Sequence, residues 1–188
     1  VRYSIRLGRL KENDLVMSSI DELKSTFTSG FARSNRYRVI FEATQYSTRE
    51  LDIMCDTVNI PGRQIFTDDR VTTLNSKKRA YQFGQEDIAM SFLLTNDWTA
   101  WDFIYEWQQQ IIIGIENLYS YNVGYREEYS RDFTIEHLDT QGDVRKRFRI
   151  MNAYPIQLDQ VELSNGTENE VIRVNTTFSY DNWKLDGV

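Results

Sequence analysis

The residue types that do nucleophilic or metal chemistry are scarce in this chain. It contains one histidine, His137, and one cysteine, Cys55, and neither stands in a spacing such as C-x-x-C or H-E-x-x-H. Catalysis of this kind needs several convergent groups. A lone histidine in a strand pattern is far more often a packing or interface residue than a general base. The sequence therefore predicts no catalytic, metal-binding or cofactor-binding site, and a protein that is not an enzyme.

Phosphate and glycoside chemistry are not indicated either. Neither a G-x-G-x-x-G nor a G-x-x-x-x-G-K-[ST] loop occurs. Carboxylates are adjacent at Asp68 and Asp69 and at Glu127 and Glu128. Neighbouring side chains on a strand point to opposite faces, so such pairs do not form the facing carboxylates that glycosidases use.

The basic run "RKRFR", residues 145 to 149, has two interpretations. It resembles a nucleic-acid platform with Phe148 as a stacking ring. On a strand, however, Arg145, Arg147 and Arg149 share one face and can instead pair with carboxylates of a neighbouring subunit or remain solvated. The net charge of −6 favours the second interpretation.

Composition sets broad limits on the fold. With 188 residues, 40% hydrophobic and 13% aromatic, the chain can bury one core and favours strands and large contacts. A pI near 4.9 predicts a field that repels free nucleic acid. One cysteine excludes an internal disulfide, and the longest purely apolar run, Ile111 to Ile113, is too short for a membrane span. We expect a soluble protein made in a reducing cytoplasm.

The first third of the sequence predicts an arm, a helix and two strands. Residues 1–17 are charged and patchily apolar, typical of an arm that orders against a partner. Residues 18–27 form a helix with a capping box. Alternation predicts a strand over 36–43 and another over 51–60, joined as a hairpin and closed by the turn Pro61-Gly62.

The middle of the chain predicts a long charged segment, a strand and a helix. Residues 63–85 are polar and charged at both signs, which indicates an extended loop or an open hairpin. A strand follows over 87–94. Asn96 or Asp97 then caps a helix over 98–116, whose apolar stripe is widened by Phe103 and Trp107.

The last third predicts strands around residues 133–137, 147–154, 156–163 and 171–180. Pro155 ends one strand and starts the next, as a corner. The predicted fold class is mainly β (α+β): an antiparallel β-sandwich or partial barrel of about seven strands, with one long flanking helix and a short N-terminal helix. Residues 1–17 form the arm and 18–188 a single domain.

The order of these features resembles the tail tube proteins of contractile-tailed bacteriophages. The resemblance rests on "SGFARSNRYRVIF", the Cys55 segment closed by "IPG", the charged loop ending near "KKR", "DIAMSFLLTNDWTAWDFIYEWQQ", "AYPIQL" and "NTTFSYDNW". It covers residues 29–183. The individual pieces are not diagnostic, but their ordered set is fairly specific.

The resemblance implies a structural virion protein without enzymatic activity. Six subunits would form a ring, and stacked hexameric rings would form the inner tail tube. The tube houses the tape-measure protein and conducts DNA, which passes without specific binding. Further implied partners are the tail sheath and the baseplate or tube-initiator proteins. The protein would be located in the virion tail and assembled in the host bacterial cytoplasm.

Three groups of residues are candidates for roles in such a tube. An acidic lumen would repel phosphates and keep DNA sliding; its candidates are Asp52, Asp56, Asp132 and Glu136. The charged loop is the candidate ring-to-ring contact, through Asp68, Asp69, Arg70, Lys77, Lys78 and Arg79. The candidates for the contact between neighbouring subunits are Arg145, Arg147 and Arg149.

Other functions remain open from the sequence. One is a tube-initiator or baseplate-junction protein of the same fold, and another is the tube subunit of a phage-like contractile injection system. A carbohydrate-binding β-sandwich is a third, but Trp98, Trp101 and Trp107 lie on a predicted helix rather than on an aromatic sheet platform.

Overall fold

The computed structural model describes residues 31–42, 46–72, 75–113, 122–164, 166 and 171–187. The predicted arm (1–17) and helix (18–27) lie outside these residues. The chain divides into two units, Val1–Ser34 and Asn35–Val188. Every element named below belongs to the second unit.

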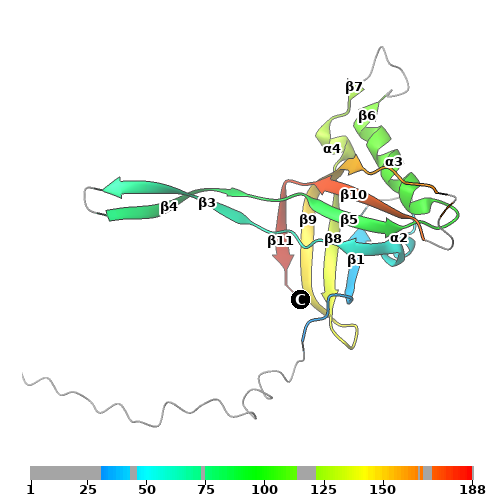
Figure 1. Ribbon diagram of the computed structural model, residues 1–188, viewed down its shortest axis with the longest axis horizontal. Helices are drawn as coiled ribbons and strands as arrows, with labels where there is room; N and C mark the ends of the chain where they lie inside the picture. Colours follow the sequence, from blue (N-terminus) through cyan, green and yellow to red (C-terminus); the bar gives the residue numbers. More distant parts are fainter. Residues whose placement is uncertain are drawn as a thin grey trace, which may run out of the picture. The chain divides into compact units, whose positions relative to one another are not determined.

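Seven antiparallel strands form the body, arranged as two sheets that share one strand (Figure 1). The first sheet has the order β1-β8-β9-β11, and the second has the order β9-β10-β5-β2. This confirms the mainly β, antiparallel fold with few helices. The strands are β1 (Tyr37–Phe41), β2 (Cys55–Val58), β5 (Ile88–Leu93), β8 (Arg131–Leu138), β9 (Val144–Leu158), β10 (Arg173–Ser179) and β11 (Asn182–Asp186).

Strand β9 runs unbroken through Pro155, so the prediction of two strands separated by this proline was wrong. Its first half pairs with β8 and β11, and its second half pairs with β10. The backbone turns at Asn152, whose φ is 53°. Pro155 lies opposite Phe178, and the register with β10 shifts there by one residue. Proline is tolerated at such a bulge, which explains why it does not end the strand.

The predicted strand over 51–60 is also corrected. Residues Thr48–Met54 form helix α2, and only Cys55–Val58 is a strand. Strand β1 pairs with β8 and β2 pairs with β5, so the predicted hairpin between them does not exist. A short apolar run fits both the helical and the strand period, and the burial of Leu51 against the core favours the helix.

Helix α3 (Thr99–Ile111) is shorter than predicted and begins differently. Its N-cap is Trp98 with φ 55° and no side-chain cap hydrogen bond, so neither Asn96 nor Asp97 caps it. The helix stops where β6 (Ile112–Ile113) pairs with β7 (Asn122–Val123), at β-branched residues that suit strands better than helices. The short helix α4 (Arg126–Tyr129) follows.

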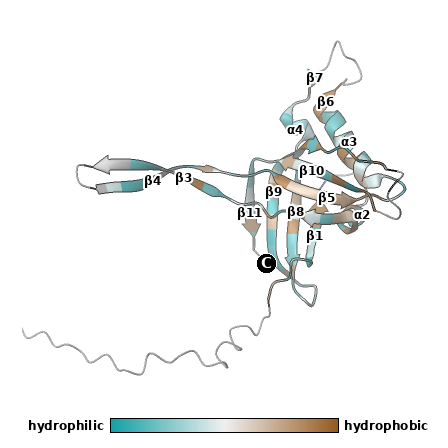
Figure 2. Ribbon diagram, viewed as in Figure 1, coloured by the Kyte–Doolittle hydropathy of each residue, from teal (hydrophilic) through white to brown (hydrophobic). Residues whose placement is uncertain are grey.

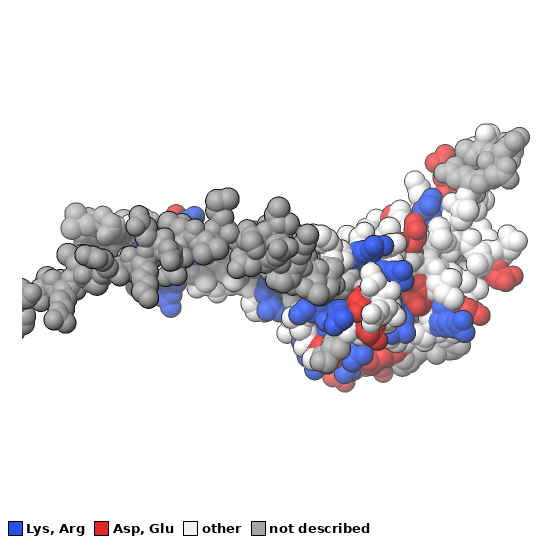
Figure 3. All heavy atoms as spheres, turned by 90° about the horizontal axis from the view of Figure 1, so that it is seen from below, with Lys and Arg blue, Asp and Glu red and all other residues white. Residues whose placement is uncertain are grey.

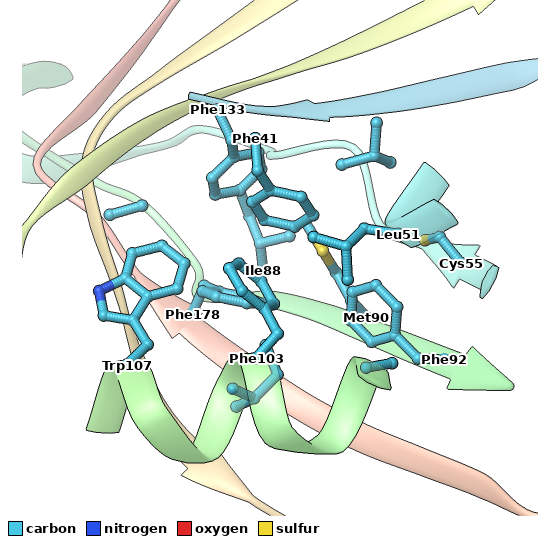
Figure 4. Close-up of a cluster of buried hydrophobic side chains, with 14 of the residues drawn as sticks. Phe41, Leu51, Cys55, Ile88, Met90, Phe92, Phe103, Trp107, Phe133 and Phe178 are labelled. Carbon is cyan, nitrogen blue, oxygen red and sulfur yellow. The ribbon is translucent and has the colours of Figure 1, made fainter. Parts of the chain in front are cut away.

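The core lies between the two sheets and α3. Phe103 and Trp107, which widen the predicted stripe, are both buried. They meet Phe41, with ring centroids 5.2 Å and 6.5 Å away, and Phe41 also lies 5.3 Å from Phe133. Figure 4 shows these rings pointing into one space. Trp107 keeps its indole N–H satisfied by donating to the Tyr129 carbonyl at 2.6 Å.

The long charged segment is a hairpin, the second of its two predicted forms. Strands β3 (Gln64–Thr72) and β4 (Asn75–Gly84) pair only with each other among the strands described. In Figure 1 they extend away from the body formed by the other seven long strands. Figure 2 shows hydrophobic residues where the hairpin leaves the sheet and hydrophilic residues along its outer part.

Because Phe41 is the common contact of the aromatic core, we expect Phe41→Ala to lower the free energy of unfolding by about 3 to 5 kcal/mol. Urea unfolding followed by Trp fluorescence measures this. Phe66→Ala, on the more exposed hairpin, is the matched control and should cost under about 1 kcal/mol. Equal losses in the two variants would contradict the assignment of the core.

Candidate functional site

A row of ion pairs crosses the outward face of the first sheet, the face opposite the core. Arg38 on β1, Glu136 on β8 and Arg147 on β9 lie directly beside one another in the strand register. The Arg38 guanidinium donates to Glu136 Oε2 at 2.7 Å, and Arg147 Nε donates to Glu136 Oε1 at 2.8 Å. Both carboxylate oxygens of Glu136 are therefore occupied by guanidinium groups.

The Glu136 carboxyl is held ionised by these two arginines. Burial by itself would raise its pKa, but the hydrogen bonds and charges of Arg147 and Arg38 outweigh burial and place the pKa below its ordinary value. A buried glutamate without such partners would be protonated or would destabilise the fold.

Two further arginines of β9 extend the row. Arg149 donates to Asp132 at 3.0 Å and lies 3.6 Å from Glu42. Arg145 bonds Asp139, in the turn after β8, at 2.7 Å. The three arginines predicted at a subunit contact are thus paired within the chain to carboxylates. Two of those carboxylates, Asp132 and Glu136, are predicted lumen residues.

The turn over residues 139–143 was the sequence signal for this pairing. Counting outward from it places Glu136 opposite Lys146, and a register shift between His137 and Leu138 moves Arg147 to the position opposite Glu136. The sequence reasoning treated the two charge sets separately and missed that one hairpin joins them. Cross-strand opposite charges of this kind are a common device of antiparallel sheets.

The other two predicted acidic residues lie elsewhere. Asp52 is on α2, where its carboxylate accepts the Val39 N–H at 2.7 Å, and burial raises its pKa. Asp56 is on β2 and pairs with Arg173 of β10 at 2.9 Å. The four predicted lumen carboxylates therefore do not form one uniform acidic strip.

The hairpin brings the predicted ring-to-ring residues together. Asp68 lies opposite Arg79, Asp69 opposite Lys78, and the backbone of Arg70 opposite that of Lys77. The side chains of Asp68, Asp69, Lys77, Lys78 and Arg79 are exposed. Opposite charges thus occupy facing positions at two of these three pairs, and both signs are available to a neighbour.

The base of the hairpin is fixed by contacts that sequence reasoning missed. The guanidinium of Arg63 lies 5.4 Å from the Phe83 ring and 5.0 Å from the Trp183 ring of β11. Gln85 donates to Asn182 at 3.1 Å. These residues are distant in sequence, and no local motif marks them.

The first sheet has open edges on both sides among the residues described. Strand β1 pairs only with β8, and β11 pairs only with β9. Leu185 on β11 is an exposed apolar side chain at such an edge. Open edges present unpaired backbone groups and are templates for another strand.

The described residues contain no group of three or more His, Cys, Asp or Glu side chains arranged to hold a metal ion. Cys55 is buried, and desolvation raises the pKa of its thiol to about 12, so it is not a ready nucleophile. In the part of the chain that is described, the helices fall short of the length and apolar character that a membrane span requires.

Comparison with known families decides which protein class has this architecture. The phage tail tube protein family matches residues 23–186. The chain belongs to this family. It is thus a tail tube protein of a phage or of a contractile injection system, and proteins of this kind are structural. A search of curated proteins found no match.

Solved structures share the fold of this tail tube protein. A chain in the extended sheath-tube complex of an extracellular contractile injection system (PVC) is 16% identical with a TM-score of 0.64, over 87% of this chain and 97% of that chain. The tube-terminating cap of the anti-feeding prophage is 19% identical with a TM-score of 0.61, over 85% of this chain and 93% of that chain. At such identities the likeness shows the fold alone.

The lowered pKa of Glu136 predicts a specific acid sensitivity. A carboxyl whose folded pKa is below its unfolded value stabilises the fold above the unfolded pKa, and this contribution is lost as pH falls through the folded pKa. We therefore expect stability to decline below pH 4.5, the ordinary value for Glu, and to decline less steeply in Glu136→Gln.

Urea midpoints measured from pH 7 to pH 3 test this expectation. The exposed Glu162 provides the control, since Glu162→Gln should follow the wild-type curve. Identical pH dependence of Glu136→Gln and the wild type would show that the Glu136 pairs do not contribute.

Proposed function

We propose that this tail tube protein is the repeating subunit of the inner tail tube, assembling into hexameric rings that stack. The observation that carries the proposal is the first sheet, which has two open edges, a core-facing side and a charged outward side. Such a sheet can continue from one copy to the next. The tube then houses the tape-measure protein and conducts DNA, and it contributes no enzymatic activity.

Ring closure follows from joining unlike edges. Strand β11 of one copy would lie beside β1 of the next, a head-to-tail contact that closes when the rotation between copies completes a circle. The contact removes both open edges, which otherwise promote aggregation. It also covers Leu185 at the β11 edge. Arg145, the most exposed of the three paired arginines, is the one best placed to contact a neighbouring subunit as well.

The outward face of the first sheet would then line the lumen, with Asp132 and Glu136 in the wall. The β3–β4 hairpin would contact the next ring through its alternating charges. Its base carries the exposed apolar residues Ile65, Tyr81 and Phe83, which such a contact would bury. The outer surface of the tube would meet the tail sheath, and its end would meet the baseplate or initiator proteins. On this proposal the protein is a virion tail component assembled in the host bacterial cytoplasm.

A second candidate is a single ring that starts or ends a tube, or the tube subunit of a phage-like injection system. The similar folds of the PVC sheath-tube chain and of the tube-terminating cap favour it. Negative-stain microscopy of the purified protein separates the candidates. Stacked rings support the repeating subunit, single rings support an initiator or terminator, and a strictly monomeric protein at high concentration contradicts both.

The edge-to-edge contact predicts that Leu185→Glu lowers the fraction of assembled rings while the monomer stays folded. The reason is that Leu185 is exposed in one copy and would be covered only by its neighbour. Loss of one buried leucine contact corresponds to about 1.5 to 3 kcal/mol, or at least about tenfold in affinity. Mass photometry measures the ring fraction, and circular dichroism checks the fold.

Leu163→Glu is the matched control, because Leu163 is exposed outside the strands. It should assemble like the wild type. Normal rings from Leu185→Glu would exclude β11 as the joining edge.

The hairpin contact predicts that reversing one cross-strand pair stops stacking. In Asp69→Lys/Lys78→Glu the pair across the hairpin and the net charge are retained, but the pattern offered to the next ring is inverted. We expect single rings in place of tubes, and the same for Lys78→Glu alone. Glu162→Lys, outside the hairpin, should leave tubes intact. Tubes of normal length from the double variant would contradict a ring-to-ring contact based on these charges.

A further inference from the structure

In most of the ion pairs on the outward face of the first sheet, the carboxylate is more buried than its arginine partner. The side chain of Glu136 is 2% exposed, while Arg38 and Arg147 are 44% and 39% exposed. Asp132 is 24% exposed against 37% for Arg149, and Asp139 is 14% exposed against 61% for Arg145. In these four pairs the carboxylate is more buried than the guanidinium, whereas in the Arg149–Glu42 pair Glu42 is the more exposed partner at 48%. A molecule approaching this face therefore meets mainly arginine, with Glu42 among the exposed groups.

The ion-paired charges on this face are also equal in number. Its ion pairs join five basic to five acidic side chains, counting the adjoining turn, in a protein whose net charge is −6. They are Arg38, Arg145, Arg147, Arg149 and Lys184 with Glu42, Asp132, Glu136, Asp139 and Asp186. Figure 3, seen from below Figure 1 toward the ends of these strands, shows basic and acidic side chains interspersed there.

We propose that this face is a charge-compensated wall along which double-stranded DNA passes without being captured or repelled. The proposal rests on the tube function above and replaces the acidic, repelling lumen expected from the sequence. An ion pair under about 4 Å long acts on a distant phosphate as a dipole, whose field falls off faster than that of a single charge. Salt at physiological concentration screens the remaining field over a distance of about 8 Å.

DNA is the passenger that such a wall suits. A duplex carries uniform negative charge, so an unpaired arginine row would bind it and release counterions, and an unpaired carboxylate row would repel it. A protein passenger carries charges of both signs. Pairing the charges of the wall would therefore change its binding or repulsion much less than it changes that of DNA. The buried Glu136 is the centre of the arrangement, because its carboxylate is hydrogen-bonded to two exposed arginines at once and lowers the positive charge that they present.

The test removes the buried carboxylate and measures DNA binding by the full-length chain. In Glu136→Gln the guanidinium groups of Arg38 and Arg147 lose their counter-charge. We expect the variant to bind a short double-stranded DNA at least about tenfold tighter than the wild type at low salt, with a salt slope steeper by about 1 to 2. Fluorescence anisotropy of labelled DNA measures both quantities.

Two controls separate this face from net charge. Glu162→Gln makes the same charge change outside the strands and should leave DNA binding unchanged. Glu136→Gln/Arg147→Gln restores the balance and should return binding to the wild-type level. Circular dichroism checks the fold. If Glu136→Gln does not fold, Asp132→Asn is the second variant: it leaves Arg149 with Glu42 as its one carboxylate partner, keeps an amide oxygen that can accept the Asn152 N–H, and should show the same direction of change.

Each outcome either supports the charge-compensated wall or contradicts it in favour of a named alternative. Equal gains in Glu162→Gln and Glu136→Gln would overturn the proposal in favour of a net-charge effect. Unchanged binding in the folded Glu136→Gln or Asp132→Asn would overturn it in favour of a solvated face or a protein passenger. Rings that form normally alongside unchanged DNA binding refute the wall alone, whereas absence of rings in the wild type refutes the tube and the wall with it.

Discussion

The turn of β9 from one sheet into the other is the constraint on which the rest of the structure depends. Asn152 adopts a left-handed conformation there, with its N–H bonded to Asp132 at 3.0 Å and its side-chain amide bonded to Asp181 at 2.9 Å. Asparagine tolerates this backbone better than most residues. The bend lets one strand pair with β8 and β11 before it and with β10 after it, so both sheets enclose a single core.

Along the strands of the first sheet, inward and outward side chains then contribute differently to the free energy of folding. Ile150 and Phe133 point inward and are fully buried, and their burial supplies the stability. Arg147 and Arg149 point outward and remain about two-fifths exposed. Partly exposed ion pairs contribute little net stability. Their role is to fix which charge lies at the surface, and that is a functional property of the wall.

The same construction explains why this tail tube protein suits assembly better than isolation. Its first sheet ends in open strands on both sides, and its hairpin extends apolar and charged side chains that the subunit does not cover. The Arg63 guanidinium lies over both the Phe83 ring at the hairpin base and the Trp183 ring of β11, so the hairpin contacts an edge strand of the first sheet. A contact made through that edge and a contact made through the hairpin are therefore mechanically connected.

The sequence by itself determined that strands occur where alternation is long and regular, around residues 36–43, 87–94, 133–137 and 171–180; the structure places them at 37–41, 88–93, 131–138 and 173–179. Alternation is local, so it can be read without knowing the partner strand. Tertiary structure decided the rest. Burial against the core made 48–54 a helix, and the bulge opposite β10 kept β9 continuous through Pro155. Register across two hairpin strands placed Glu136 between two arginines, because which charges meet depends on strand pairing and not on composition.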